Sequence, residues 1–246
     1  MAEGSVVLTA DRGGRQIASW LHLAGYFAIM AYLLGAGIYS QRVGVGGGAA
    51  SGQLMDHSQA IRSYLLSILA NVGITYYCWV GVHWRGGTMA TLTGGRWRSW
   101  KGVAVDVAIA VPVCVVWQAT AYGVQRLLGR NEARSVESML PQSAVEVVLW
   151  ILVSVVAGFC EEIQSRGYLQ QQLRALSGSV VAAVLGQAVM FGLIHSYQGW
   201  KKMVVIAVLG LLYGALAAWR RNLRANMISH AWLDVWNGWL QQVVWR

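Results

Sequence analysis

Residues 143–163 read SAVEVVLWILVSVVAGFCEEI, and this stretch decides the fold class. Apart from Glu146, it carries no charge until Glu161 and Glu162 at its end. A helix needs about 20 mostly apolar residues to cross the hydrocarbon core of a bilayer. The stretch is therefore predicted to be a membrane-spanning helix with two adjacent carboxylates near one end.

The composition of the whole chain agrees with this prediction. Of its 246 residues, 56% are hydrophobic and only 12% are charged, whereas soluble domains have roughly 25% charged residues. The mean hydropathy is +0.46. These values exclude a disordered chain, a coiled coil and a disulfide-rich secreted module, so we predict an all-α integral membrane protein.

Seven apolar stretches are long enough to be candidate spans. They cover roughly residues 17–39, 62–84, 102–124, 143–163, 179–196, 202–219 and 223–244. The glycine-rich stretch 44–53 is predicted to be a loop, and residues 126–142 a polar connector. Since no internal repeat is found, residues 1–246 are predicted to form a single membrane domain, a polytopic bundle of about seven transmembrane helices.

The net charge is +9, from 19 Lys and Arg residues against 10 Asp and Glu residues. The basic residues lie mostly between the apolar stretches, as in loops that contact anionic lipid headgroups. We therefore expect the lipid bilayer, and no nucleic acid, as a partner. Placing the N-terminus in the cytoplasm puts most basic residues on the inner side, and a bacterial cytoplasmic membrane is the expected location.

Ionisable side chains within apolar stretches are costly, so each is a candidate functional residue. Asp106 and Glu146 lie near the starts of spans, where they are expected to reach water at the headgroups. On a helix, Glu162 and Arg166 are i and i+4 and are able to form an ion pair. Glu161 is turned by about 100° onto an adjoining face, where it is left to act as a base. A headgroup-level salt bridge that fixes the end of a span fits the same residues.

Two histidines lie on later apolar stretches. His195 follows Phe191 by one helical turn, and a hydrogen-bonded structural role or a catalytic role fits its position. His230 and Asp234 are i and i+4 on one face, where the carboxylate can orient the imidazole and select its tautomer. Together with the glutamates, these residues form a set that is able to activate water and stabilise an oxyanion.

An even arrangement of the spans leaves one difficulty. At about 1.5 Å per residue, Glu161 would lie near the exit of its helix and His195 near the opposite face of the membrane. The two meet only if the helix over 143–163 starts well outside the hydrocarbon, or the helix over 179–196 begins partway into it. The residues alone leave both arrangements open.

Three motifs follow one another on these stretches: Glu161-Glu162-x-x-x-Arg166, Phe191-x-x-x-His195 and His230-x-x-x-Asp234. This pattern, over about residues 140–240, resembles the CPBP intramembrane proteases. That family groups the type II CAAX prenyl endopeptidases with bacteriocin-processing and abortive-infection proteins. Two positions depart from its pattern: Ser165 stands where many members have an aromatic residue, and Asp234 where prenyl-processing members typically have asparagine.

The resemblance implies hydrolysis of peptide bonds in membrane-associated peptide or protein substrates, with prenylated CAAX-type substrates as one class. The catalytic candidates under it are Glu161, Glu162, Arg166, His195, His230 and Asp234. It implies that Glu161 activates the attacking water with help from His195. His230 and Asp234 would stabilise the oxyanion or place the water, and the glutamate–arginine pair of the first motif would hold that motif in shape.

Three alternatives stay open at this point. No cofactor is expected, but in an alternative with a divalent metal such as zinc, His195, His230 and Glu161 would be the ligands. A catalytically silent immunity or partner protein of the same family would keep the motifs as structure. A proton-coupled transporter would use the buried Glu and His residues as a relay, although the sequence lacks the repeated halves typical of transporters.

Overall fold

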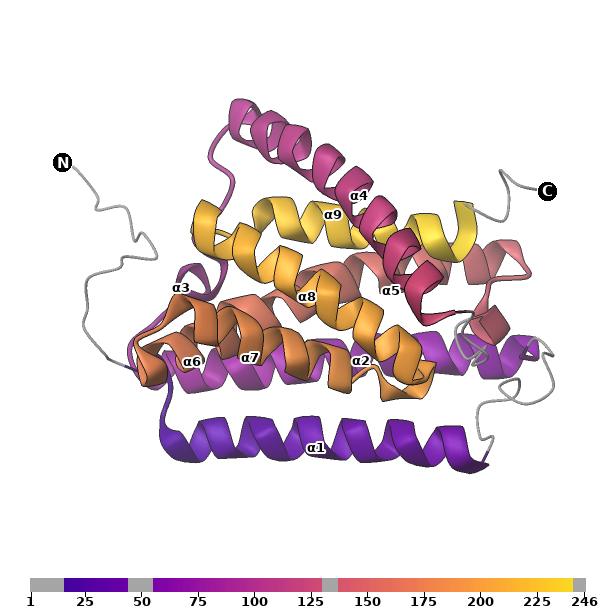
Figure 1. The fold of residues 1–246 in the computed structure, drawn as a ribbon, viewed down its shortest axis with the longest axis horizontal. Helices are drawn as coiled ribbons and strands as arrows, with labels where there is room; N and C mark the ends of the chain where they lie inside the picture. Colours follow the sequence, from indigo (N-terminus) through magenta and orange to yellow (C-terminus); the bar gives the residue numbers. More distant parts are fainter. Residues whose placement is uncertain (1–15, 44–54, 130–136, 241–246) are drawn as a thin grey trace.

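The computed structural model describes residues 16–43, 55–129 and 137–240, which form a bundle of helices without strands (Figure 1). The long helices are α1 (Trp20–Val43), α2 (His57–His83), α4 (Trp100–Leu128), α5 (Ala144–Glu162) and α8 (Trp200–Arg220). The shorter segments are α3 (Met89–Thr93), η1 (Glu137–Met139), η2 (Ile163–Leu169), α6 (Gln170–Ser177), α7 (Val180–Leu193), η3 (Ser196–Gln198), α9 (Arg224–Val235) and η4 (Trp236–Leu240). The predicted loop 44–53 and residues 130–136 of the predicted connector lie outside the described residues. The predicted all-α polytopic fold is confirmed.

Five helical segments among the described residues are long and apolar enough to cross a membrane, where the sequence suggested about seven. They are α1, α2, α4, α8 and the continuous segment Ala144–Ser177. The stretches 179–196 and 223–244 instead form the short helices α7, with 14 residues, and α9, with 12 residues. α7 packs against α8, and α9 packs against α5 and α4. The apolar side chains of α9 are therefore largely covered by protein, whereas α7 buries one face and exposes Val180, Val181, Leu185 and Val189 on the other.

The helix that carries the two glutamates does not end near residue 163, as expected. It continues through the π-helical segment η2 and through α6, so Glu161 lies near the middle of 34 helical residues that end at Ser177. All seven residues of η2 are buried. The helix continues through polar residues because their side chains form hydrogen bonds within the protein. Gln164 donates to Thr75 at 3.1 Å, and Gln172 donates to the backbone just before α1 at 3.1 Å.

A tight hairpin between α6 and α7 brings distant residues to the same level. Gly178 ends α6 with φ of 67°, a left-handed conformation that glycine adopts without strain. At about 1.5 Å per residue, Glu161 lies about 24 Å before the end of α6, and His195 lies about 22 Å beyond the start of α7. The sequence suggested opposite faces of the membrane for Glu161 and His195 because the helix of Glu161 was expected to end at residue 163, whereas it continues to Ser177.

Asp106 and Glu146 are fully buried, which corrects the expectation that they reach water at the headgroups. Asp106 on α4 forms ion pairs with Arg220 at 2.9 Å and with Arg224 at 2.8 Å. Glu146, in the first turn of α5, pairs with His57 at the start of α2. Each carboxylate thus joins two segments, and the first one ties α4 to the turn between α8 and α9.

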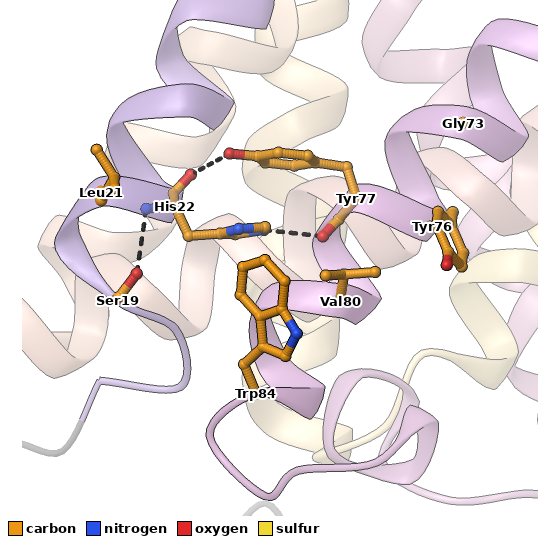
Figure 2. A pocket seen from close by; sticks show the side chains of 8 residues that line it. All are labelled: Ser19, Leu21, His22, Gly73, Tyr76, Tyr77, Val80 and Trp84. Carbon is orange, nitrogen blue, oxygen red and sulfur yellow. Dashed lines mark hydrogen bonds between the residues drawn. The ribbon is translucent and has the colours of Figure 1, made fainter.

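α1 and α2 pack together through a histidine and a tyrosine (Figure 2). Nε2 of His22 donates to the backbone oxygen of Tyr77 at 2.8 Å, and the Tyr77 hydroxyl donates to the backbone oxygen of His22 at 2.8 Å. Beside this pair lies a cavity of about 490 Å³, lined by Ser19, Leu21, His22, Gly73, Tyr76, Tyr77, Val80 and Trp84. The candidate catalytic residues are not among these, so the cavity is separate from the cluster that they form.

Candidate active site

The six candidate residues meet inside the bundle on two helices, the continuous helix Ala144–Ser177 and α9, and on the turn after α7. They are Glu161 and Glu162 at the end of α5, Arg166 in η2, His195 after α7, and His230 and Asp234 on α9. Oε2 of Glu161 lies 3.9 Å from Nε2 of His195 and 3.8 Å from Nε2 of His230. Oδ2 of Asp234 lies 3.7 Å from the same nitrogen of His230. The structure therefore places all six residues in one cluster.

Glu162 joins two parts of this cluster. Its Oε1 accepts a hydrogen bond from Nη1 of Arg166 at 3.0 Å and another from Nδ1 of His230 at 2.9 Å. The side chains of Glu162 and Arg166 have no exposed surface. The predicted ion pair is thus present. However, the carboxylate bonded to Nδ1 of His230 is Glu162 and not Asp234, and Nε2 of His230 therefore faces Glu161.

Two aromatic rings enclose Arg166. The centre of its guanidinium lies 4.2 Å from the ring centroid of Phe191 and 5.5 Å from that of Tyr213. The rings of Phe191 and Tyr213 also lie 6.0 and 5.8 Å from the ring of His230. Such cation–π contacts stabilise a guanidinium most when water is excluded. Sequence reasoning missed Tyr213, since one tyrosine in an apolar stretch gives no pattern.

The orientation of His195 follows from one backbone contact. Its Nδ1 donates a hydrogen bond to the backbone oxygen of Phe191 at 2.7 Å. Because a carbonyl oxygen only accepts, Nδ1 carries the hydrogen, and Nε2 of the neutral ring presents a lone pair towards Glu161. The separation of 3.9 Å from Glu161 is too long for a direct hydrogen bond and is one at which a bridging water is to be considered. The Ser196 hydroxyl fixes this segment to α1 by donating to the backbone oxygen of Leu34 at 3.0 Å.

α2 adds a residue that sequence reasoning missed. The side chain of Asn71 lies beside that of Glu161. Asn71 also accepts hydrogen bonds from Nε2 of Gln164 on its backbone oxygen, at 3.1 Å, and on Oδ1, at 3.3 Å. A single amide in an apolar stretch has no spacing to reveal it, so the sequence offered no signal for this contact.

The comparison with protein families decides what kind of domain this cluster belongs to. The model of the family described as type II CAAX prenyl endopeptidase Rce1-like matches residues 143–236. These residues form an Rce1-like domain. No curated protein and no solved structure matches the chain. The Rce1-like domain contains all six candidate residues, and with five candidate membrane spans among the described residues the chain is an integral membrane protein.

The zinc alternative needs a set of ligands around one point. In the described part of the chain, no group of three or more His, Cys, Asp or Glu side chains is placed so that it could hold a metal ion. Glu161, His195 and His230 of the Rce1-like domain, the three ligands expected in that alternative, therefore do not form a metal site as they are arranged.

The contact between α5 and α9 depends on Gly158 of the Rce1-like domain. A Cβ atom at this position would lie 2.5 Å from the backbone nitrogen of Ala231 and 2.8 Å from its Cα. Real Cβ atoms do not come so close to backbone, and packed helices have no spare volume to absorb the overlap. The absence of a side chain at Gly158 thus lets α9 bring His230 within reach of Glu162.

We expect Gly158→Ala to destabilise the Rce1-like domain, because α5 and α9 must move apart. Overpacking of this kind costs about 1–3 kcal/mol. Thermal unfolding of the purified protein in detergent measures the loss as a lower melting temperature. Gly35→Ala on α1 is the matched control, since a Cβ atom there meets nothing within 4 Å. Equal melting temperatures for the two variants would contradict the close contact.

Proposed function

We propose that this protein is an intramembrane endopeptidase that hydrolyses peptide bonds of membrane-associated substrates, with prenylated CAAX-type peptides as the first class to test. One observation carries the proposal: within the Rce1-like domain, Glu161 faces Nε2 of His195 at 3.9 Å and Nε2 of His230 at 3.8 Å. Peptide hydrolysis requires a base that activates water and a donor that receives the negative charge on the carbonyl oxygen. These three side chains supply both.

In the proposed mechanism, a water molecule lies between Glu161 and His195. Glu161 takes a proton from this water while the water oxygen attacks the carbonyl carbon of the substrate. Nε2 of His195 accepts a hydrogen bond from the same water and keeps it oriented, because Nδ1 is fixed on the backbone oxygen of Phe191. When the C–N bond breaks, Glu161 passes its proton to the leaving nitrogen and becomes a carboxylate again.

His230 lies where the oxyanion of the tetrahedral intermediate would form. Since its Nδ1 hydrogen is used on Glu162, Nε2 donates to the oxyanion when the ring is an imidazolium, the form that the surrounding carboxylates Glu161, Glu162 and Asp234 stabilise. Asp234 faces this nitrogen at 3.7 Å and would orient it before the substrate enters. An ionised carboxylate repels an oxyanion, so we assign Asp234 to orienting His230 and not to direct contact with the intermediate.

Cleavage of a quenched prenylated CAAX peptide by the purified full-length protein in lipid nanodiscs tests this proposal. We expect cleavage by the unchanged protein and a fall in kcat of about 100-fold or more in His195→Gln, since a lost acid–base group costs about 10²–10⁴-fold. His83→Gln is the matched control because His83 is an exposed histidine at the end of α2. It should leave kcat nearly unchanged.

Two further arms of the assay separate the alternatives. An excess of a strong chelator is expected to leave kcat unchanged, because no proposed step uses a metal ion. Loss of cleavage that added zinc restores would instead make Glu161, His195 and His230 metal ligands. A folded protein that cleaves neither the prenylated peptide nor its unprenylated form would contradict the proposal and favour a catalytically silent partner protein.

A further inference from the structure

α2 lies outside the Rce1-like domain, but it places a polar face against the helix that carries Glu161. Asn71 and Thr75 are i and i+4 on α2 and therefore share this face. The Thr75 hydroxyl donates to the backbone oxygen of Cys160, one residue before Glu161, at 3.5 Å. Gln164, three residues after Glu161, donates to the Thr75 hydroxyl at 3.1 Å. The polar face of α2 thus spans the helical turn on which Glu161 lies.

The contacts of Asn71 fix which way its amide points. Nε2 of Gln164 donates to the backbone oxygen of Asn71 at 3.1 Å, and this contact identifies the atom of Gln164 as nitrogen. The atom of the Asn71 amide that faces the same nitrogen at 3.3 Å must then be the oxygen, Oδ1. The nitrogen of Asn71 donates one hydrogen to the backbone oxygen of Ser67 at 3.2 Å. Its second hydrogen is left for the side chain of Glu161, which lies beside the Asn71 amide.

We propose that Asn71 is a positioning residue for Glu161, and that its amide N–H holds the carboxylate so that Oε2 faces the two histidines. This inference rests on the proposed function, because it gives Asn71 a part in the same reaction. Arg166 does not serve this purpose, since its Nη1 is bonded to Glu162 at 3.0 Å. A neutral donor can orient Glu161 without placing a full positive charge against the base.

Isosteric variants on the same face of α2 test the proposal in the peptide cleavage assay. Asn71→Leu and Thr75→Val each remove a partner of Gln164 with little change in volume, but only Asn71→Leu removes the donor to Glu161. We expect Asn71→Leu to lower kcat by about 10- to 100-fold, the effect of losing one hydrogen bond to a charged group. KM should stay nearly constant. Asn71→Asp, which replaces the donor by an acceptor, should lower kcat at least as far, and Thr75→Val should change kcat little.

Two outcomes of this assay would overturn the assignment. A higher KM at unchanged kcat in Asn71→Leu would make Asn71 a substrate contact. Equal losses of kcat in Asn71→Leu and Thr75→Val would show that the shared hydrogen-bond network, and not the contact with Glu161, matters.

Failure of the proposed function gives a different result, since the unchanged protein and a Glu161→Gln variant would then not differ in cleavage. The contact itself is tested without activity by thermal unfolding of single and double variants. If Asn71 bonds to Glu161, Asn71→Leu lowers the melting temperature less in a Glu161→Leu background than in the unchanged protein. Equal decreases in the two backgrounds would overturn the contact.

Discussion

Glu161→Gln is expected to lower kcat for the prenylated peptide by about 10³–10⁴-fold, towards the upper end of what a general base contributes. Glutamine has nearly the shape of glutamate, but it cannot take a proton from water. The neighbouring carboxylate, Glu162, is not a substitute, because its Oε1 accepts from Arg166 at 3.0 Å and from His230 at 2.9 Å. Kinetic measurements on the purified variant in nanodiscs give the loss directly.

A matched carboxylate separates this effect from a general loss of charge. Asp56 is an exposed N-cap residue of α2 that accepts from the backbone nitrogen of Gln59, and asparagine caps helices as well as aspartate does. Asp56→Asn should therefore cleave at the rate of the unchanged protein. If Glu161→Gln also cleaves at that rate while remaining folded, Glu161 is not the base.

Arg166→Met is expected to cause the largest loss of stability. The variant leaves Glu162 fully buried without its cation, and removing one partner of a buried ion pair costs about 3–5 kcal/mol. Methionine still fills the space beside Phe191 and Tyr213, so the lost charge should dominate over lost packing. In thermal unfolding in detergent, the melting temperature should fall by on the order of 10 °C.

A double variant shows whether the unpaired charge is the cause. Adding Glu162→Gln to Arg166→Met should recover part of the melting temperature, because no carboxylate is then left buried without its cation. The glutamine oxygen can still accept the Nδ1 hydrogen of His230. Arg126→Met, at an exposed arginine on α4, is the matched control and should cost less than about 1 kcal/mol. A double variant that is less stable than Arg166→Met alone would contradict this account.

Hydropathy located most helices to within a few residues, since the expected span 102–124 corresponds to α4 (Trp100–Leu128) and 202–219 to α8 (Trp200–Arg220). It overstated the number of long spans for two reasons: α9 is an apolar helix covered by protein, and α7 ends at Leu193 after only 14 residues although its sequence stays apolar. It also ended the helix of Glu161 too early, because buried Gln164 and Gln172 count as polar although their hydrogen bonds are made inside the protein.

The three motifs predicted which residues cluster, but not which of them are hydrogen-bonded to one another. The spacing on α9 suggested Asp234 as the partner of His230, whereas Nδ1 of His230 is bonded to Glu162, 68 residues away in the sequence. Spacing along one helix reports only neighbours on that helix. Asn71 and Tyr213 come from other helices, and their place beside the cluster is set by tertiary packing, which a single sequence does not reveal.

Ion pairs and hydrogen bonds join the Rce1-like domain to helices that precede it in the chain. Arg220 and Arg224 lie within the matched residues, but both pair with Asp106 on α4. Ser196 likewise depends on the backbone of Leu34 in α1. A chain cut at residue 143 would lose these ion pairs and this hydrogen bond together with the surfaces of α2 and α4 that pack on α5 and α9, and a small domain has little stability to spare. We therefore expect the matched segment to be a unit of sequence but not of folding, so a transplant of the site into another protein would have to carry α1, α2 and α4 with it.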